Sequence, residues 1–276
     1  MNNPEEKKYI QATKSEDSST RIEALYTLNE LEYSEIAPLL LHLLSTDPDK
    51  DVRAEAAFLL RSLGHQSSLL PTVGPPLLAA LTDGDEKVRN NAAETLGFLQ
   101  YEVATGPLQN LLKADPFWFV RSSAAEALGR LGDPGSIPAL LHASSDSELE
   151  VQRSAIQALG QFLHDPKIAP FVTSALLDEK KDPLIKAELS SLSYRLGHQS
   201  HLYALLALLS ETNDYEFMSN VLMILSDLVE KSSLFDLTTD QEGIHSTLQD
   251  ILHKEPSLHS DIERITQMLP SYFDIS

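Results

Sequence analysis

Asp115–Gly132 reads DPFWFVRSSAAEALGRLG, and its second half holds a pattern that recurs along most of the chain. When the copies are aligned on Arg121, a leucine follows each of the first five anchors seven residues later. Successive anchors lie 31 to 36 residues apart, and a period of this size indicates a solenoid of stacked repeats. The anchors are Arg21, Arg53, Arg89, Arg121 and Gln152, with weaker copies at Lys186 and Met218.

Apolar residues within each copy follow helical spacing. In the central copy they are Val120, Ala124, Ala125 and Leu128, which share one face of an α-helix. Paired alanines let a neighbouring helix approach to about 8 Å. Four positions before the anchor, an acidic residue predicts a helix N-cap in every copy except the central one, which has Phe117. The acidic cap positions are Asp17, Asp49, Asp85, Glu148, Asp182 and Asp214.

The pattern Asp-x-x-x-x-Val-Arg-x-x-Ala-Ala-x-x-Leu-Gly resembles the HEAT repeat, in particular the type first described in phycobilisome lyases. The resemblance covers roughly residues 15–230. Its clear copies are 47–64, 83–97, 115–132 and 146–160, and its degenerate copies are 15–31, 180–197 and 212–228. It implies a structural ladder between neighbouring repeats, formed by Asp47, Arg53, Asp83, Arg89, Asp115 and Arg121. It is specific for the fold and weak for function, because many unrelated functions use this repeat.

We therefore predict an all-α fold. Residues 1–230 should form a right-handed superhelix of about seven HEAT-like helix pairs, and residues 231–276 a C-terminal helical cap packed on the last repeat. Proline interrupts helix interiors, and one predicted helix contains Pro71, Pro75 and Pro76. We expect this helix to begin only near Pro75 or Pro76, with a loop before it.

The composition argues against several classes of partner. The chain has 41 acidic and 21 basic residues, which gives a formal net charge of −20. A polyanionic nucleic acid or an anionic membrane surface would be repelled. A partner with a basic segment is compatible with this charge, and a merely solvated acidic surface is the alternative.

The sequence contains no cysteine, which excludes disulfides, thiol catalysis and cysteine metal sites. The opening residues Met1–Glu6 have neither a basic nor an apolar signal region, and no run approaches the roughly 18 apolar residues of a membrane span. We expect a cytoplasmic protein.

The aromatic run Phe117, Trp118 and Phe119 occurs once, at positions that are polar or charged in most other copies. Three aromatic side chains at the start of one helix cannot all face inward, so we predict a partner-binding rim there. The alternative is that one or two rings cover the groove to the next repeat. Tyr215 stands at the Trp118 position three copies later and is a weaker candidate.

Glutamates occupy predicted solvent positions of the second helices, which should line the concave face. Stacking would align them into an acidic stripe, with Glu94 and Glu126 as candidate contacts for a basic or helical segment of a partner. A solvated face is the alternative. The stripe consists of Glu23, Glu55, Glu94 and Glu126.

Nothing in the sequence predicts a catalytic or metal site. His198 and His201 lie three residues apart without a carboxylate at helical spacing, and the chain has no His-Glu dipeptide and no H-E-x-x-H motif. No phosphate-binding glycine motif is present, and no nucleophile, base and orienting group can be assigned.

The leading interpretation is a non-catalytic scaffold or adaptor without a cofactor, which binds a protein partner through its concave face and aromatic rim. The resemblance supplies an alternative, a bilin lyase or bilin-handling chaperone subunit that acts on phycobiliproteins. In that case Trp118 would stack on a bilin, and an acid such as Glu126 would protonate or orient a pyrrole. A third interpretation is a purely structural role in a larger assembly.

Overall fold

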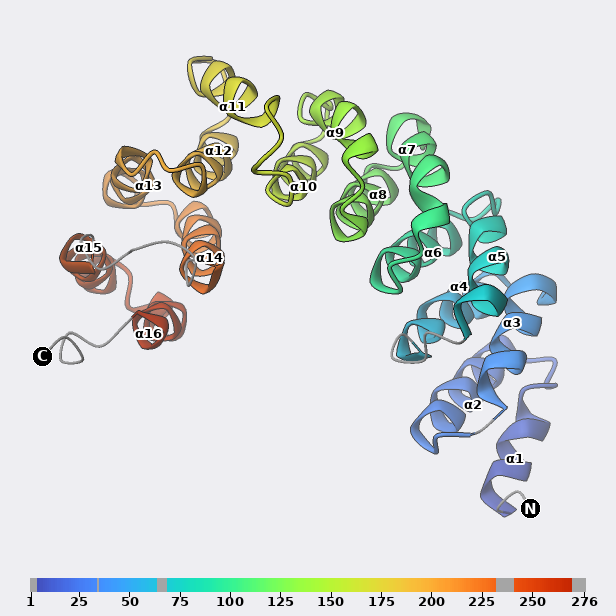
Figure 1. The fold of residues 1–276 in the computed structure, drawn as a ribbon. Helices are drawn as coiled ribbons and strands as arrows, with labels where there is room; N and C mark the ends of the chain where they lie inside the picture. Colours follow the sequence, from blue (N-terminus) through green and yellow to red (C-terminus); the bar gives the residue numbers. More distant parts are fainter. Residues whose placement is uncertain (1–3, 34, 64–68, 232–240, 270–276) are drawn as a thin grey trace, which may run out of the picture. The chain divides into compact units, whose positions relative to one another are not determined.

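The computed structural model describes residues 4–33, 35–63, 69–231 and 241–269, and within them the regular elements are helices, without a strand. The predicted all-α solenoid is confirmed (Figure 1). Contacts divide the chain into two compact units, residues 1–161 and 162–276.

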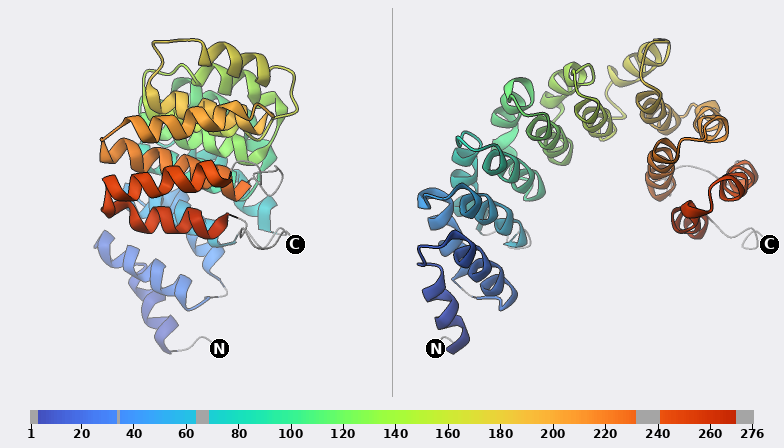
Figure 2. Two further views of the ribbon diagram at one scale, coloured as in Figure 1. Left: turned by 90° about the vertical axis from the view of Figure 1, so that its left-hand side faces the viewer. Right: turned by 180° about the vertical axis from the view of Figure 1, so that it is seen from behind.

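The first unit consists of five pairs of helices. Within each pair the second helix packs against the second helices of neighbouring repeats, so that α2, α4, α6, α8 and α10 form one layer. The first helices α3, α5, α7 and α9 lie along its other side (Figures 1 and 2). The helices are α1 (Pro4–Ala12), α2 (Ser18–Glu30), α3 (Ile36–Thr46), α4 (Lys50–Leu59), α5 (Leu70–Ala80), α6 (Glu86–Phe98), α7 (Thr105–Ala114), α8 (Trp118–Leu131), α9 (Ile137–Ala143) and α10 (Leu149–Leu159).

The apolar residues of the repeat form the core of this unit. In α8 the four pattern residues Val120, Ala124, Ala125 and Leu128 have no exposed surface. Burying a valine or leucine side chain stabilises the fold by roughly 1.5–3 kcal/mol, so each repeat depends on its neighbours to cover this face.

The predicted caps form at five of the six acidic positions. The Asp17, Asp49, Asp85 and Asp182 side chains accept N–H groups of the first helical turn, and Asp214 accepts that of Phe217. The prediction is wrong for Glu148, whose side chain makes no such bond. A glutamate is one methylene longer than the aspartate and asparagine that N-caps favour.

Glycines bring the second helices close together. A Cβ added to Gly97 of α6 would lie 2.6 Å from the Cα and Cβ of Ala127 in α8. A Cβ added to Gly129 would lie 2.8 Å from the Cβ of Ala158 in α10. At these points the backbone of one helix therefore packs directly against an alanine of the next helix.

The prediction that the proline-containing helix begins near Pro75 or Pro76 is wrong. Helix α5 begins at Leu70, with Pro71 in its first turn, where the missing N–H would have no helical partner anyway. Pro75 and Pro76 leave two helical carbonyls without their N–H groups, and these belong to the exposed residues 71 and 72. Burial of the opposite face outweighs the cost of the prolines.

The second unit continues the same alternation of helices. Helix α12 packs against α11, α13 and α14, while α15 packs on α13 and α16 packs on α14. Parts of the predicted C-terminal cap, residues 232–240 and 270–276, lie outside the described residues. The boundary at residue 230 and the handedness of the superhelix stay predictions. The helices are α11 (Ile168–Leu176), α12 (Pro183–Arg195), α13 (Ser200–Glu211), α14 (Tyr215–Lys231), α15 (Gln241–Lys254) and α16 (His259–Met268).

Candidate functional site

An ion-pair ladder joins consecutive helix pairs of the first unit. In its third rung, Arg89 Nε and Nη2 donate to the two carboxylate oxygens of Asp115 at 2.7 and 3.1 Å, and both residues are buried. This geometry fits the planar guanidinium to a carboxylate through two parallel hydrogen bonds. Within the described residues four rungs have it: Arg21–Asp47, Arg53–Asp83, Arg89–Asp115 and Arg121–Asp146.

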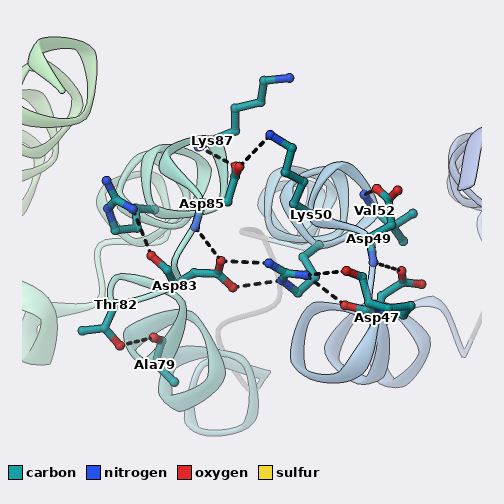
Figure 3. A network of polar contacts seen from close by, with 12 residues as sticks. Asp47, Asp49, Lys50, Val52, Ala79, Thr82, Asp83, Asp85 and Lys87 are labelled. Atoms are coloured by element: carbon teal, nitrogen blue, oxygen red, sulfur yellow. Dashed lines mark hydrogen bonds and ion pairs between the residues drawn. The ribbon is translucent and has the colours of Figure 1, made fainter. Parts of the chain in front are cut away.

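Each aspartate of the ladder also organises its own repeat. Asp83 Oδ1 accepts the N–H of Asp85 at 2.9 Å, and the carbonyl oxygen of Asp83 accepts Arg89 Nη1 at 2.9 Å (Figure 3). One residue thus binds the arginine of the preceding repeat with its side chain and the arginine of its own repeat with its backbone. This arrangement fixes the turn before each second helix against the neighbouring repeat.

The ladder predicted from the resemblance lacks two residues that the structure shows to belong to it. Arg21 pairs with Asp47 in the first rung, and Asp146 pairs with Arg121 in the last. Both stand at the arginine and aspartate positions of the pattern, so alignment on the anchor would have found them. At the fifth anchor, Gln152 keeps only the bond within its repeat, from Nε2 to the carbonyl oxygen of Asp146 at 2.7 Å.

Two rungs of the ladder, those of Asp83 and Asp146, make the first unit sensitive to acid. Burial by itself would raise the pKa of Asp83, but hydrogen bonds from Arg53 and from the Asp85 N–H outweigh it and hold the pKa below its ordinary value of 3.8. The pKa of Asp146 is lowered in the same way, with Arg121 as the main opposing group to burial. A carboxyl whose pKa is lower in the folded than in the unfolded state stabilises the fold when the pH is above the unfolded-state pKa. That stability is lost as the pH falls through the folded-state pKa.

We expect Asp83→Asn to reduce the free energy of unfolding most at pH 7 and progressively less below about pH 4, because the native Asp83 then loses its charge as well. Urea unfolding of both proteins at pH 7, 4 and 3 measures this convergence. Glu150→Gln is the matched control, since the exposed side chain of Glu150 has no hydrogen bond or ion pair within the described part of the chain. A difference for Asp83→Asn that stays constant from pH 7 to pH 3 would contradict the expectation.

Phe117, Trp118 and Phe119 form a ring cluster at the start of α8. The ring centres of Phe117 and Phe119 lie 5.7 Å apart, and the Trp118 ring stands perpendicular to Phe119 at 5.9 Å. Phe119 is half-buried, whereas 40% of Phe117 and 44% of Trp118 remain exposed. The Arg89 guanidinium lies 5.9 Å from the Phe117 ring centre, so the cluster packs against the third rung of the ladder.

The cluster replaces charges that pair between the two preceding repeats. There Lys50 lies 3.0 Å from Asp85, and Lys87 lies 3.0 Å from Asp51. Trp118 stands at the position of Lys50. Where the second and third repeats present a polar, ion-paired edge, the fourth repeat therefore presents two exposed aromatic rings. Large rings with few rotatable bonds are typical anchors of protein interfaces.

Glu94 and Glu126 are half-buried between neighbouring second helices. Glu94 accepts a hydrogen bond from Ser123 of α8 at 3.1 Å, and Glu126 accepts one from Ser154 of α10 at 3.4 Å. Arg130 also approaches Glu126, at 3.4 Å. Both carboxylates thus bind the next helix of the stack, and their role in binding a basic segment stays a prediction.

Tyr215 is the first residue of α14 in the second unit, and half of its surface is exposed. Its role in binding also stays a prediction.

His198 and His201 have ring centres 6.1 Å apart, and His201 Nδ1 lies 3.2 Å from the buried Ser193 hydroxyl. Among the residues that the structure describes, no three histidine or acidic side chains are grouped so that they could hold a metal ion. None of the described helices is long and apolar enough to cross a bilayer.

One group of residues was not predicted at all. Tyr26, Phe58, Arg61 and Phe98 line a hollow at the C-terminal ends of α2, α4 and α6. The sequence does contain a signal for part of it, because Tyr26 and Phe58 each stand five residues after their anchor.

Known proteins share both the repeat and the fold. The family model for HEAT repeats matches residues 6–71, 37–129, 74–159 and 107–193. Phycocyanobilin lyase subunit alpha of Picosynechococcus sp. (strain PCC 7002) is 45% identical over 71 residues, which cover 23% of this chain and 26% of that protein. The matched stretch therefore spans about a quarter of the length of that relative.

Two solved structures resemble the chain over most of its length. The complex of CpcE and CpcF of phycocyanin lyase from Nostoc sp. PCC7120 matches with 22% identity, 84% coverage of this chain, 92% of that chain and a TM-score of 0.56. The YibA protein of E. coli matches with 21% identity, 97% and 91% coverage and a TM-score of 0.56. At these identities the likeness shows the fold alone. The family match covers more than half of the sequence, and the chain belongs to the HEAT-repeat family.

Proposed function

We propose that this chain is a non-catalytic HEAT-repeat subunit that binds a protein partner through Phe117 and Trp118. The observation that supports it is the exposure of both rings at positions where the two preceding repeats carry the paired charges of Asp85 and Lys50. The cluster is held by Phe119 and the third rung of the ladder, so little entropy is lost when a partner covers it. The phycocyanin lyase neighbour is itself a complex of two proteins. The cytoplasmic location expected from the sequence is part of this proposal.

The only tryptophan of the chain allows a direct test. We expect Trp118→Ser to change the free energy of unfolding by less than about 1 kcal/mol, because the side chain is exposed, and to weaken partner binding by about 30-fold or more. Trp118 fluorescence of the native chain identifies extract fractions that shift the emission to shorter wavelength and protect it from iodide. Binding of those fractions to immobilised native and Trp118→Ser protein then measures the loss.

Tyr203→Ser is the matched control, because Tyr203 is an aromatic residue of similar exposure in the second unit. It should bind the same fraction as the native chain does. The proposal fails if no fraction protects Trp118, or if Trp118→Ser retains the partner as well as Tyr203→Ser does.

A second candidate is a subunit that handles bilins, and it is favoured by the 45% identity to phycocyanobilin lyase subunit alpha. Trp118 and Glu126 both lie on α8, eight residues and therefore roughly 12 Å of helix rise apart. Addition of phycocyanobilin to the purified chain tests this candidate. A saturable change in visible absorbance that Trp118→Ser abolishes would support it, and an unchanged spectrum would exclude bilin binding by the isolated chain.

A further inference from the structure

A hollow of about 670 Å³ lies where the C-terminal ends of three second helices stack side by side. Its aromatic walls come from one residue of each helix, Tyr26 of α2, Phe58 of α4 and Phe98 of α6. Phe98 is 54% exposed and Tyr26 38%, so the hollow is open to solvent. Its volume falls in the range of small-ligand and side-chain binding sites.

Arg61, in the short 3-10 helix η1 (Leu60–Leu63) after α4, extends over these rings. Its guanidinium carbon lies 4.7 Å from the ring centre of Phe58 and 5.3 Å from that of Phe98. Stacking on two aromatic faces holds the guanidinium plane and leaves its N–H groups at the edge. Within the described residues no carboxylate lies at ion-pair distance from Arg61, in contrast to the four arginines of the ladder.

Asn29 and Ser62 also line the hollow, where the Ser62 hydroxyl donates to Asn29 Oδ1, and two other polar groups restrict the ligand. The Tyr26 hydroxyl donates to Glu55, and burial, followed by this bond, raises the pKa of Tyr26 to about 12. Tyr26 therefore stays protonated and its ring is held in place. The exposed Glu30 lies on the α2 side of the hollow, where it disfavours a second negative charge.

We propose that this hollow is a docking site for a protein segment that carries one acidic side chain next to an aromatic or large apolar one. The carboxylate binds the N–H groups of Arg61 through two hydrogen bonds, and the apolar neighbour fills the space between Tyr26 and Phe98. Local charge complementarity supports this occupant, because Arg61 is a stacked cation that has no carboxylate at ion-pair distance among the described residues. The site is distinct from the Phe117 and Trp118 cluster, and neither depends on the other.

Two dipeptides test the site directly. The probes are N-acetyl-Phe-Glu-amide and N-acetyl-Phe-Gln-amide, which differ only in the charge of one side chain. In the ¹⁵N-labelled native chain we expect the Glu peptide to shift the Arg61 Nε–H signal saturably at about 1 mM, and the Gln peptide to bind at least tenfold more weakly. Free acetate distinguishes docking of a segment from binding of a bare anion.

Variants locate the effect within the hollow. Arg61→Lys keeps the charge but loses the planar guanidinium, and Phe98→Ala removes one stacking face. Each substitution should weaken binding of the Glu peptide about tenfold, as measured by the shifts of the backbone N–H signals of residues 58–63. Trp118→Ser should bind it as the native chain does, which separates this site from the proposed partner site. The proposal is overturned by no shift up to about 10 mM, by equal binding of the two peptides, or by acetate binding as tightly as the Glu peptide.

Discussion

Replacement of Arg89 by alanine is expected to lower the free energy of unfolding by about 3–5 kcal/mol. The change leaves the Asp115 carboxylate buried without its guanidinium partner, and breaking a buried pair from one side has a cost of this size. The Asp83 carbonyl also loses its bond to Arg89, and the Phe117 ring loses the cation beneath it. A shift of the urea midpoint without a change in slope measures the loss.

Arg130→Ala is the matched control, because Arg130 pairs with Glu126 at the exposed surface of α8. It should cost less than about 0.5 kcal/mol. Hydrogen exchange should localise the Arg89→Ala effect to α6 and α8, since each repeat of a solenoid contacts only its neighbours. Equal costs for the two arginine substitutions would refute the structural role of the third rung.

The double variant Arg89→Met/Asp115→Leu distinguishes the net contribution of the ion pair from the cost of leaving one charge buried without its partner. When both charges are removed, no uncompensated charge remains, and an apolar pair of similar volume is often neutral or stabilising. We therefore expect the double variant to recover much of the stability that Arg89→Ala loses. A double variant as unstable as Arg89→Ala would mean that the stability comes mainly from the other contacts of the two residues, which are those of Arg89 with the Asp83 carbonyl and the Phe117 ring and that of Asp115 with the Phe117 N–H.

The resemblance to the HEAT repeat predicts most of the ladder because an arginine and an aspartate recur at fixed positions of the pattern. Arg53 and Asp83 illustrate these two positions. The pair depends on two hydrogen bonds between the side chains and on the turn that the Asp83 carboxylate holds through the Asp85 N–H. The caps are predictable for the same reason, because an aspartate before a helix acts within its own few residues. The exception, Glu148, fails through the length of its side chain.

Features that depend on the stacking of repeats could not be predicted in this way. The helical spacing predicts solvent positions for Glu94 and Glu126. Each is nevertheless half-buried and accepts a hydrogen bond from a serine of the next helix. Arg61 stands where two other copies of the pattern have Gly97 and Gly129, and only stacking brings Phe98 within 5.3 Å of it. Helix α5 extends through Pro75 because tertiary burial outweighs local propensity.

Replacement of Gly97 by alanine is expected to destabilise the first unit by about 2–3 kcal/mol, although alanine favours an isolated helix over glycine by about 1 kcal/mol. The new Cβ would lie 2.6 Å from both Cα and Cβ of Ala127, so that α6 and α8 must move apart. Gly129→Ala should behave similarly, since its Cβ would lie 2.8 Å from that of Ala158. Urea unfolding again provides the measurement.

Gly106→Ala distinguishes crowding from helix propensity. Gly106 lies in α7, and a Cβ there would meet nothing within 4 Å. It should change the free energy of unfolding by less than about 1 kcal/mol, because the lower entropy of the unfolded chain is opposed by the contact of the new Cβ with the ring of Pro107. A loss of stability for Gly97→Ala that clearly exceeds the effect of Gly106→Ala would show that close packing of the second helices, and not the flexibility of glycine, selects the small residue in α6. A stabilising Gly97→Ala would mean that α6 and α8 can separate at little cost, and the close approach would then contribute nothing to the stability of the solenoid.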